Sequence, residues 1–296
     1  MVVWLVFLVW LGPFPSTEDP GAGAPVVEDG LVAHFYPGKE TGAKPGVVVI
    51  GGSGGGIDWQ DYQAEILAKN GYAALALAYF GMEGLPSSLE RIPLEYFEKA
   101  LRWLARQPGV DAERIGVCGI SKGGELVLLL ASNYPQVKAV AALVPGAYVF
   151  QSIAPGWPVT SSWTKNGEPL PFVPYLVTQN FDRHNLSVMY RETIGQKEYL
   201  EAAAIPVERI AGPVLMISGT DDKIWPSTEM CGLVEQRMRA HGFTHFFQHI
   251  AYPGAGHTIG RIGGDPEGRN GGTAEANRRA QEDTQTQILS FFKIHL

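Results

Sequence analysis

The stretch GVCGISKGGEL at residues 116–126 places a serine, Ser121, between glycines at the junction of two apolar runs. The run before it has the composition of a strand buried on both faces, and the run after it has the length of a helix. Residues 119–123 match the pattern G-x-S-x-G. On a tight strand-to-helix turn, a serine presents its hydroxyl at a helix N-terminus, where backbone N–H groups stabilise negative charge. We therefore expect Ser121 to be a nucleophile.

The rest of the chain repeats this strand-to-helix alternation on both sides of Ser121. Short apolar runs alternate with longer segments of helical periodicity, which is typical of βαβ units and a mostly parallel sheet. The clearest helix, at residues 94–107, places Leu94, Phe97, Leu101 and Leu104 on one side. The predicted strands lie at residues 31–37, 46–52, 72–80, 114–120, 137–146, 212–219 and 244–252, and the other predicted helices at 61–71, 122–134, 230–240 and 274–293.

The alternation breaks at residues 148–209, a region rich in proline and aromatic residues. We interpret this region as a cap inserted over the sheet that shapes a pocket; a surface excursion without a ligand role is the alternative. Residues 26–296 then form one domain.

Composition limits the classes of function. The chain of 296 residues is 45% hydrophobic and 18% charged, and its 23 basic and 30 acidic residues give a net charge of −7. With no basic cluster, a nucleic-acid partner is not expected. The two cysteines, Cys118 and Cys231, form no CxxC pair. Cys118 lies in an apolar run, where a buried, unreactive thiol is expected.

Residues 1–25 open with an apolar run that ends near Leu11 and is too short to span a bilayer as a helix. Its length fits the apolar part of a signal peptide, and AGA at residues 22–24 resembles a cleavage site. No Lys or Arg precedes the run, and Pro25 would follow the cut. The sequence therefore leaves cytoplasmic residence and export both open, and predicts no stable membrane span.

A serine hydroxyl needs a base to remove its proton, and the base needs a carboxylate to orient it. The candidate base is His257, in the loop YPGAGHTI just after a predicted strand. Two adjacent acids, Asp221 and Asp222, follow another predicted strand. We choose Asp222, because the spacing from Gly219 lets the chain leave the strand before presenting the acid. Asp221 would then point elsewhere and could cap the following turn.

Each of these residues also has an ordinary structural explanation. Ser121 could be only a helix N-cap, and His257 only a loop histidine with satisfied hydrogen bonds. The order Ser, Asp, His along the chain, with each residue after a strand, is that of α/β-hydrolases. The sequence therefore predicts the α/β-hydrolase fold, a mostly parallel doubly wound sheet with an inserted cap region.

Such a site also needs two N–H donors for the oxyanion. One should be the backbone N–H of Lys122, directly after the nucleophile. The other should come from the glycine-rich loop VVVIGGSGGGI at residues 47–57. We choose the N–H of Ser53, with Gly54 as the alternative. The loop lacks the G-K-[ST] ending of a phosphate-binding P-loop and the acid of a dinucleotide fingerprint, so a nucleotide cofactor is not expected.

Three histidines recur at every fourth residue, His241, His245 and His249. Gly242 should end the helix before them, so that His245 and His249 lie along one strand. Four residues of strand span about 13 Å, which is too far for one metal ion. We interpret the repeat as a coincidence on the surface and predict no metal site and no cofactor.

Four segments carry a more specific resemblance: LEYFEKALRWLARQPGV, GVCGISKGGELVLLLAS, IPVERIAGPVLMISGTDDKIWPS and YPGAGHTI. From about Leu31 to its end, the chain resembles the catalytic domain of the acyl-CoA thioesterase and bile acid-CoA:amino acid N-acyltransferase family. It is more distantly similar to dienelactone hydrolases. The resemblance implies a triad of Ser121, Asp222 and His257.

In that family, thioesterases carry serine at the nucleophile position and the acyltransferases carry cysteine, so Ser121 favours hydrolysis. The resemblance implies a small-molecule substrate, an acyl thioester such as an acyl-CoA, and an acyl-enzyme intermediate. The alternatives are a carboxylesterase or dienelactone-type hydrolase, an acyl-CoA N-acyltransferase, and a non-catalytic ligand-binding protein. The sequence gives neither the acyl chain length nor the oligomeric state.

Overall fold

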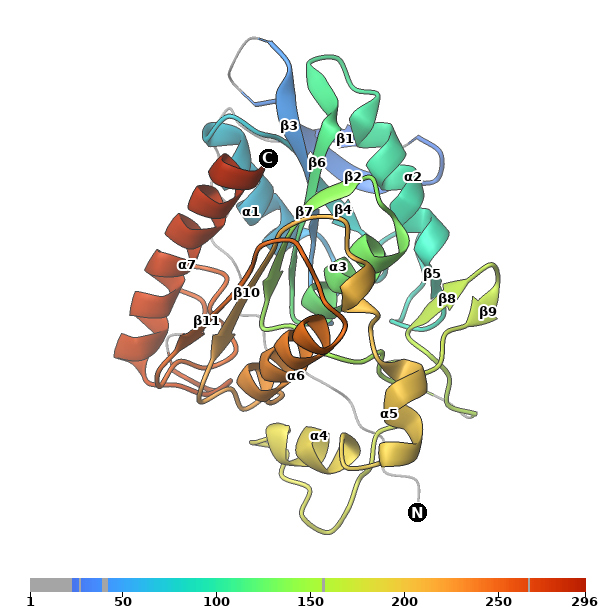
Figure 1. The fold of residues 1–296 in the computed structure, drawn as a ribbon, viewed down its shortest axis with the longest axis vertical. Helices are drawn as coiled ribbons and strands as arrows, with labels where there is room; N and C mark the ends of the chain where they lie inside the picture. Colours follow the sequence, from blue (N-terminus) through green and yellow to red (C-terminus); the bar gives the residue numbers. More distant parts are fainter. Residues whose placement is uncertain (1–22, 27, 39–41, 156–157, 266) are drawn as a thin grey trace.

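One twisted sheet of eight strands runs through the described part of the chain (Figure 1). The computed structural model describes residues 23–26, 28–38, 42–155, 158–265 and 267–296, so the apolar N-terminal segment, residues 1–25, lies almost wholly outside it. The strand order is β1-β2-β4-β3-β6-β7-β10-β11. The bounds are β1 Ala24–Val26, β2 Val32–Tyr36, β3 Lys44–Ile50, β4 Ala73–Ala78, β6 Val110–Ile120, β7 Val137–Leu143, β10 Val214–Gly219 and β11 Phe247–Tyr252.

The six strands from β4 to β11 are parallel, and β1 and β2 join their edge in antiparallel pairs. Every residue of β4 and β10 is buried, which is why these strands are continuous apolar runs rather than alternating ones. The mostly parallel sheet expected from the sequence is therefore present.

Helices cover both faces of the sheet (Figure 1). On one face, α2, α3 and α6 bury Phe97, Leu126 and Met230 in one apolar layer. On the other face, α1 and α7 bury Leu67 and Ile288 in a second layer. Each fully buried side chain of this size stabilises the fold by about 1.5–3 kcal/mol. The bounds are α1 Asp58–Lys69, α2 Leu94–Ala105, α3 Lys122–Asn133, α6 Ser227–Ala240 and α7 Ala274–His295.

The region 148–209 follows β7 and leads into β10. It contains β8 Trp163–Lys165, β9 Glu168–Pro169, α4 Ser187–Thr193, α5 Lys197–Ala203 and the short 3-10 helix η1 Val207–Arg209. Figure 1 shows α4 and α5 beyond the ends of the central strands. A second, three-stranded sheet pairs β8 with β9 and with β5 Ile92–Pro93, just before α2. Residues 148–209, called the insertion below, are thereby attached to the main domain.

Several predicted boundaries were wrong. β11 begins at Phe247 rather than near residue 244, because its pairing with β10 starts where Val214 lies opposite Phe247. α6 begins at Ser227 rather than at residue 230, since the backbone N–H of Met230 already bonds to the carbonyl of Pro226. The sequence also gave no signal for β1 and β5, which have only three and two residues.

Candidate active site

Ser121 lies on the turn between β6 and α3 with a strained backbone. Its φ is 58° and its ψ is −122°, a conformation that costs a non-glycine residue about 1–3 kcal/mol. Its side chain makes no capping hydrogen bond to α3, so the N-cap explanation does not account for this serine. Backbone strain of this kind is concentrated at active sites.

The glycines of the motif let three backbone segments meet at this turn. A Cβ on Gly119 would lie 2.2 Å from the carbonyl oxygen of Gly123. A Cβ on Gly123 would lie 2.4 Å from the carbonyl oxygens of Ile50 and Gly51, at the end of β3. No side chain fits at those distances, so both glycines are required for this turn to form beside β3.

The structure brings Ser121, His257 and Asp222 together from three different strand ends. The Oγ of Ser121 lies 2.9 Å from Nε2 of His257, and Nδ1 of His257 lies 2.8 Å from Oδ2 of Asp222. All three side chains are buried. Such hydrogen bonds are stronger when they are buried away from water. With His257 between the hydroxyl and the carboxylate, the arrangement suits transfer of a proton from the hydroxyl to the imidazole.

The two adjacent acids have different partners. Oδ1 of Asp222 accepts hydrogen bonds from the backbone N–H groups of Ile224 and Trp225, which leaves Oδ2 for His257. Asp221 instead accepts from the backbone N–H of Gly272, in the loop before α7. The expectation that Asp221 caps the following turn was therefore wrong, because Asp222 itself caps that turn.

The residues expected to supply oxyanion donors border Ser121. Lys122 is the first residue of α3, so its backbone N–H has no intrahelical acceptor. On the other side, a Cβ placed on Gly52 would lie 3.1 Å from Cβ of Ser121, so the peptide that leads into Ser53 passes directly beside Ser121. The N–H of Ser53 donates to no acceptor within the described residues. Gly54 is exposed.

Two groups at this site were not predicted from the sequence, Tyr79 and Trp225. The hydroxyl of Tyr79, just after β4, is buried and shared between the carbonyls of Gly51 and Gly52, at 3.0 and 3.2 Å. Trp225 packs edge-on to His257 with 6.1 Å between ring centroids, and its Nε1 donates to the carbonyl of Val144. The sequence signal for Tyr79 was its position as an aromatic residue with a hydroxyl directly after a buried strand.

A buried ion pair lies in the first turn of α3, directly after Ser121. Nζ of Lys122 is 2.8 Å from both carboxylate oxygens of Glu125, and both side chains are almost wholly inaccessible to water. Desolvation raises the pKa of Glu125 and lowers that of Lys122, while their mutual attraction opposes both shifts. Nζ also lies 5.3 Å from the ring centroid of Trp163, which belongs to the insertion.

The three spaced histidines do not converge. His241 directly follows α6, and His245 lies in the loop between α6 and β11. His245 therefore does not share a strand with His249, contrary to the expectation. His249 is not a surface residue either, since its side chain is 10% exposed and its Nε2 lies 2.7 Å from Oγ of Ser218. Among the described residues, no three His, Cys, Asp or Glu side chains are placed to share a metal ion.

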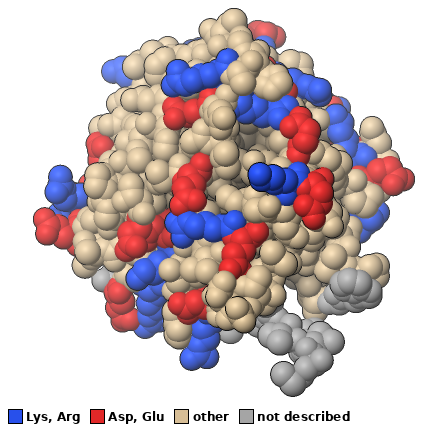
Figure 2. Space-filling model, turned by 60° about the horizontal axis from the view of Figure 1, so that its bottom comes forward, with Lys and Arg blue, Asp and Glu red and all other residues tan. Residues whose placement is uncertain are grey.

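The cysteines are Cys118 and Cys231, and both are free and buried. Cys118 was expected to be buried, and burial raises its pKa to about 12. Within the described part of the chain, no helix combines the length and the apolar character needed to cross a bilayer. Among the described residues on the face in Figure 2, basic and acidic side chains are intermixed rather than gathered by sign.

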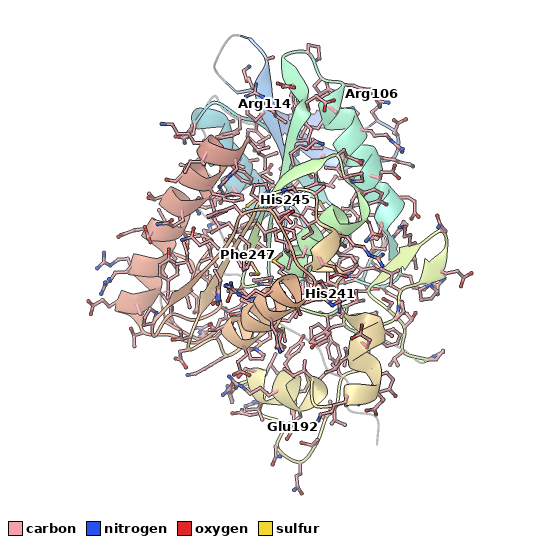
Figure 3. The ribbon with its side chains drawn as sticks, viewed as in Figure 1. Arg106, Arg114, Glu192, His241, His245 and Phe247 are labelled. Atoms are coloured by element: carbon pink, nitrogen blue, oxygen red, sulfur yellow. The ribbon has the colours of Figure 1, made fainter. Side chains whose placement is uncertain are left out.

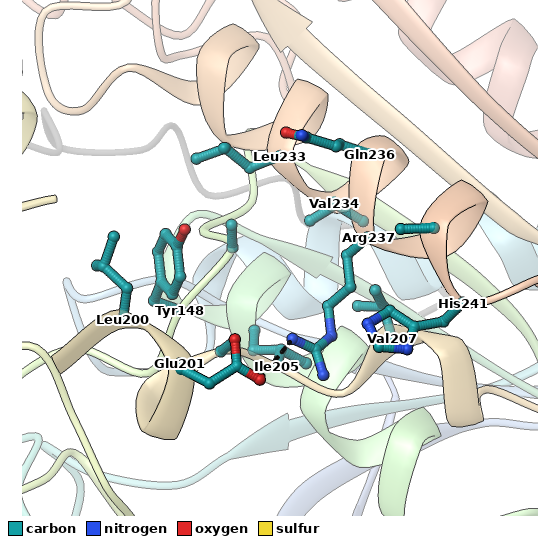
Figure 4. A pocket seen from close by; sticks show the side chains of 13 residues that line it. Tyr148, Leu200, Glu201, Ile205, Val207, Leu233, Val234, Gln236, Arg237 and His241 are labelled. Carbon is teal, nitrogen blue, oxygen red and sulfur yellow. Dashed lines mark ion pairs between the residues drawn. The ribbon is translucent and has the colours of Figure 1, made fainter. Parts of the chain in front are cut away.

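Two surface hollows lie away from Ser121, His257 and Asp222. One, of about 250 Å³, lies between α5, η1 and α6, and its rim carries Glu201, Arg237 and His241 (Figure 4). Arg237 is paired there with Glu201 and, at 2.7 Å, with Glu208. The other, of about 330 Å³, lies beside α2 near Arg106, at the end of the molecule opposite Glu192 of α4 (Figure 3). Neither hollow is lined by Ser121, His257 or Asp222.

The family model and the most similar sequences both relate this chain to acyl-CoA thioesterases. Residues 92–261 match the family described as "BAAT / Acyl-CoA thioester hydrolase C terminal". The chain is 33% identical over 290 residues to acyl-coenzyme A thioesterase 2, mitochondrial, of Mus musculus, an alignment that covers 92% of this chain and 60% of that protein. It is also 33% identical over 290 residues to acyl-coenzyme A thioesterase 6 of Homo sapiens, covering 94% of this chain and 66% of that protein. The chain thus spans about two thirds or less of these relatives.

Solved structures agree on the fold. A putative dienelactone hydrolase from Klebsiella pneumoniae superposes with a TM-score of 0.58 at 20% identity, covering 89% of this chain and 92% of that one. An esterase from Pyrobaculum calidifontis superposes with a TM-score of 0.55 at 17% identity, covering 89% and 80%. The predicted α/β-hydrolase fold is therefore confirmed.

Proposed function

Because the chain belongs to the BAAT / acyl-CoA thioester hydrolase C-terminal family, we propose that it is a serine hydrolase that cleaves acyl thioesters, with acyl-CoA as the substrate class. The observation that carries this proposal is the continuous pair of hydrogen bonds from Ser121 through His257 to Asp222, at 2.9 and 2.8 Å. The substrate class is supported by the relatives, which are named acyl-coenzyme A thioesterases.

The first half of the reaction forms an acyl-enzyme. Nε2 of His257 takes the proton of the Ser121 hydroxyl as the oxygen attacks the thioester carbonyl. Asp222 keeps the other ring nitrogen protonated and stabilises the positive charge on the imidazolium. The N–H groups of Lys122 and Ser53 hold the negative oxygen of the tetrahedral intermediate, which collapses as the C–S bond breaks and the thiolate leaves, taking the proton from His257.

The second half returns the enzyme to its starting state. His257 removes a proton from a water molecule, which attacks the ester carbonyl of acylated Ser121. The same two N–H groups hold the second oxyanion. The C–O bond to Ser121 then breaks, its oxygen regains a proton from His257, and the carboxylic acid is released.

The proposal is tested by release of free thiol from acyl-CoAs of graded chain length, with an aryl ester measured beside them. The folded variant Ser121→Ala is the control. The proposal expects thiol release that depends on Ser121, with the acid as the other product. Both cysteines are buried, so a thiol reagent added to the native protein should register the released CoA rather than the chain.

Three results would overturn this assignment in different ways. Ester cleavage without thiol release would indicate a carboxylesterase or a dienelactone-type hydrolase. Formation of an amide in place of the acid, when glycine is supplied, would indicate an acyltransferase. A folded protein that binds acyl-CoA but cleaves neither substrate would indicate a ligand-binding protein.

A further inference from the structure

Trp163, at the start of β8, is a fully buried residue of the insertion that reaches the first turn of α3. Its Nε1 donates a hydrogen bond of 2.8 Å to Oε1 of Glu125. β8 is fixed to the main domain, because Ile92 pairs with Trp163 across β5 and β8. A side chain from outside the core sheet therefore lies against the nucleophile turn in a fixed position.

Glu125 connects Trp163 to the first proposed oxyanion donor. Its backbone N–H donates to the carbonyl of Ser121 at 3.0 Å. That carbonyl belongs to the same planar peptide unit as the N–H of Lys122, so holding one end of the unit sets the direction of the other. The carboxylate of Glu125 is in turn held by Trp163 and by Nζ of Lys122.

Tyr79 connects Trp163 to the second proposed donor. The two rings pack with 5.9 Å between their centroids. The hydroxyl of Tyr79 holds the carbonyl of Gly52 at 3.2 Å, and this carbonyl shares a peptide unit with the N–H of Ser53. The same planarity argument therefore applies on this side of the nucleophile.

We propose that Trp163 is a positioning residue that aligns both oxyanion donors, Lys122 through Glu125 and Ser53 through Tyr79. This inference rests on the proposed function for the identity of the two donors. It makes the geometry of the oxyanion hole depend on the placement of the insertion. Since a displacement of about 1 Å can cost 10²-fold in rate, small movements of Trp163 should be measurable in turnover.

The test is the variant Trp163→Phe, which keeps an aromatic ring and removes the N–H donor. The chain offers a matched control in Trp103, on α2. Trp103 is also buried, and its Nε1 also donates a 2.8 Å hydrogen bond to a glutamate, Glu28. Trp103→Phe therefore removes the same kind of bond without touching the nucleophile turn. A second variant, Tyr79→Phe, removes only the hydroxyl that holds the carbonyls of Gly51 and Gly52. It tests the same arrangement with a smaller change if Trp163→Phe folds poorly.

Two readouts are compared with the thermal unfolding of each variant: kcat and KM for thiol release, and the rate of labelling by a fluorophosphonate. Labelling also passes through an oxyanion but needs no thioester. We expect Trp163→Phe and Tyr79→Phe to lower kcat and the labelling rate together by about 10- to 100-fold, somewhat less than the loss of one donor outright. KM and the shape of the pH profile should change little, because His257 and Asp222 are untouched.

The inference is overturned if Trp163→Phe loses no more activity than Trp103→Phe at a similar loss of stability. It is also overturned if KM rises while kcat and the labelling rate stay constant, since Trp163 would then contact the substrate instead. A wild-type protein that reacts with the fluorophosphonate but releases no thiol from any acyl-CoA would refute the proposed substrate. The labelling rates of the variants would still decide the role of Trp163.

Discussion

Asp221 and Asp222 allow a sharp test of the proposed site, because they are adjacent carboxylates with different partners. Asp222→Asn keeps the size of the side chain and can keep the backbone hydrogen bonds from Ile224 and Trp225. It replaces the carboxylate oxygen 2.8 Å from Nδ1 of His257 by an amide. An amide N–H facing Nδ1 favours the tautomer with the proton on Nε2, which cannot accept the proton of Ser121.

The expected loss in kcat is about 10⁴-fold, the scale found when a triad aspartate becomes asparagine. This corresponds to about 5 kcal/mol of transition-state free energy. Asp221→Asn is the control. Its amide oxygen can still accept from the N–H of Gly272, so kcat should stay within about threefold and unfolding should cost at most about 1 kcal/mol.

The assay is steady-state thiol release by both variants, with unfolding by denaturant measured on the same samples. The reasoning would be refuted if Asp222→Asn kept more than about a tenth of the wild-type kcat. It would also be refuted if Asp221→Asn lost as much activity as Asp222→Asn.

Three further predictions concern stability and reactivity. Gly123→Ala should destabilise the fold by about 1–3 kcal/mol, because its Cβ would lie 2.4 Å from two carbonyl oxygens at the end of β3. Gly232 lies inside α6, and a Cβ placed on it would meet nothing within 4 Å, so Gly232→Ala should instead stabilise the fold by about 0.5–1 kcal/mol. Denaturant titrations measure the free energy of unfolding of both variants, and equal changes in the two would contradict the prediction. The hydrogen bond with Asp61 raises the pKa of His34 above 6.5, so the stability that His34 adds should be full below about pH 6.5 and lost as the pH rises through the raised pKa. Unfolding of His34→Gln at several pH values checks this, and a contribution that grows with pH would contradict it. Burial raises the pKa of Cys118 and Cys231, so both thiols should react with a disulfide reagent only upon unfolding, and fast reaction of the native protein would contradict the structure.

The sequence could predict the turn at Ser121 because the requirements of that turn are local. Ser121 lies between a buried strand and a helix, and Gly119 and Gly123 are the only residue type that fits between them. The proximity of Asp222 and His257 to Ser121 could also be predicted, since parallel strands bring their carboxyl ends to one edge of the sheet. Asp222 and His257 each follow a strand, so they had to emerge near Ser121.

Other features depend on packing between distant segments, which leaves no local pattern. Trp163 and Glu125 are 38 positions apart, and their hydrogen bond exists only because the insertion folds back onto α3. β5 and β9 have two residues each, too few for a recognisable period. The different partners of Asp221 and Asp222 depend on the loop before α7, which the spacing from β10 does not reveal.

The central claim is that Ser121, activated by His257, is the nucleophile. The most direct measurement is mass spectrometry of the protein after reaction with a fluorophosphonate, followed by mapping of the modified peptide. The account predicts one adduct, located on Ser121, and none in a folded Ser121→Ala variant. An adduct on another residue, or a folded wild-type protein that stays unmodified, would contradict it.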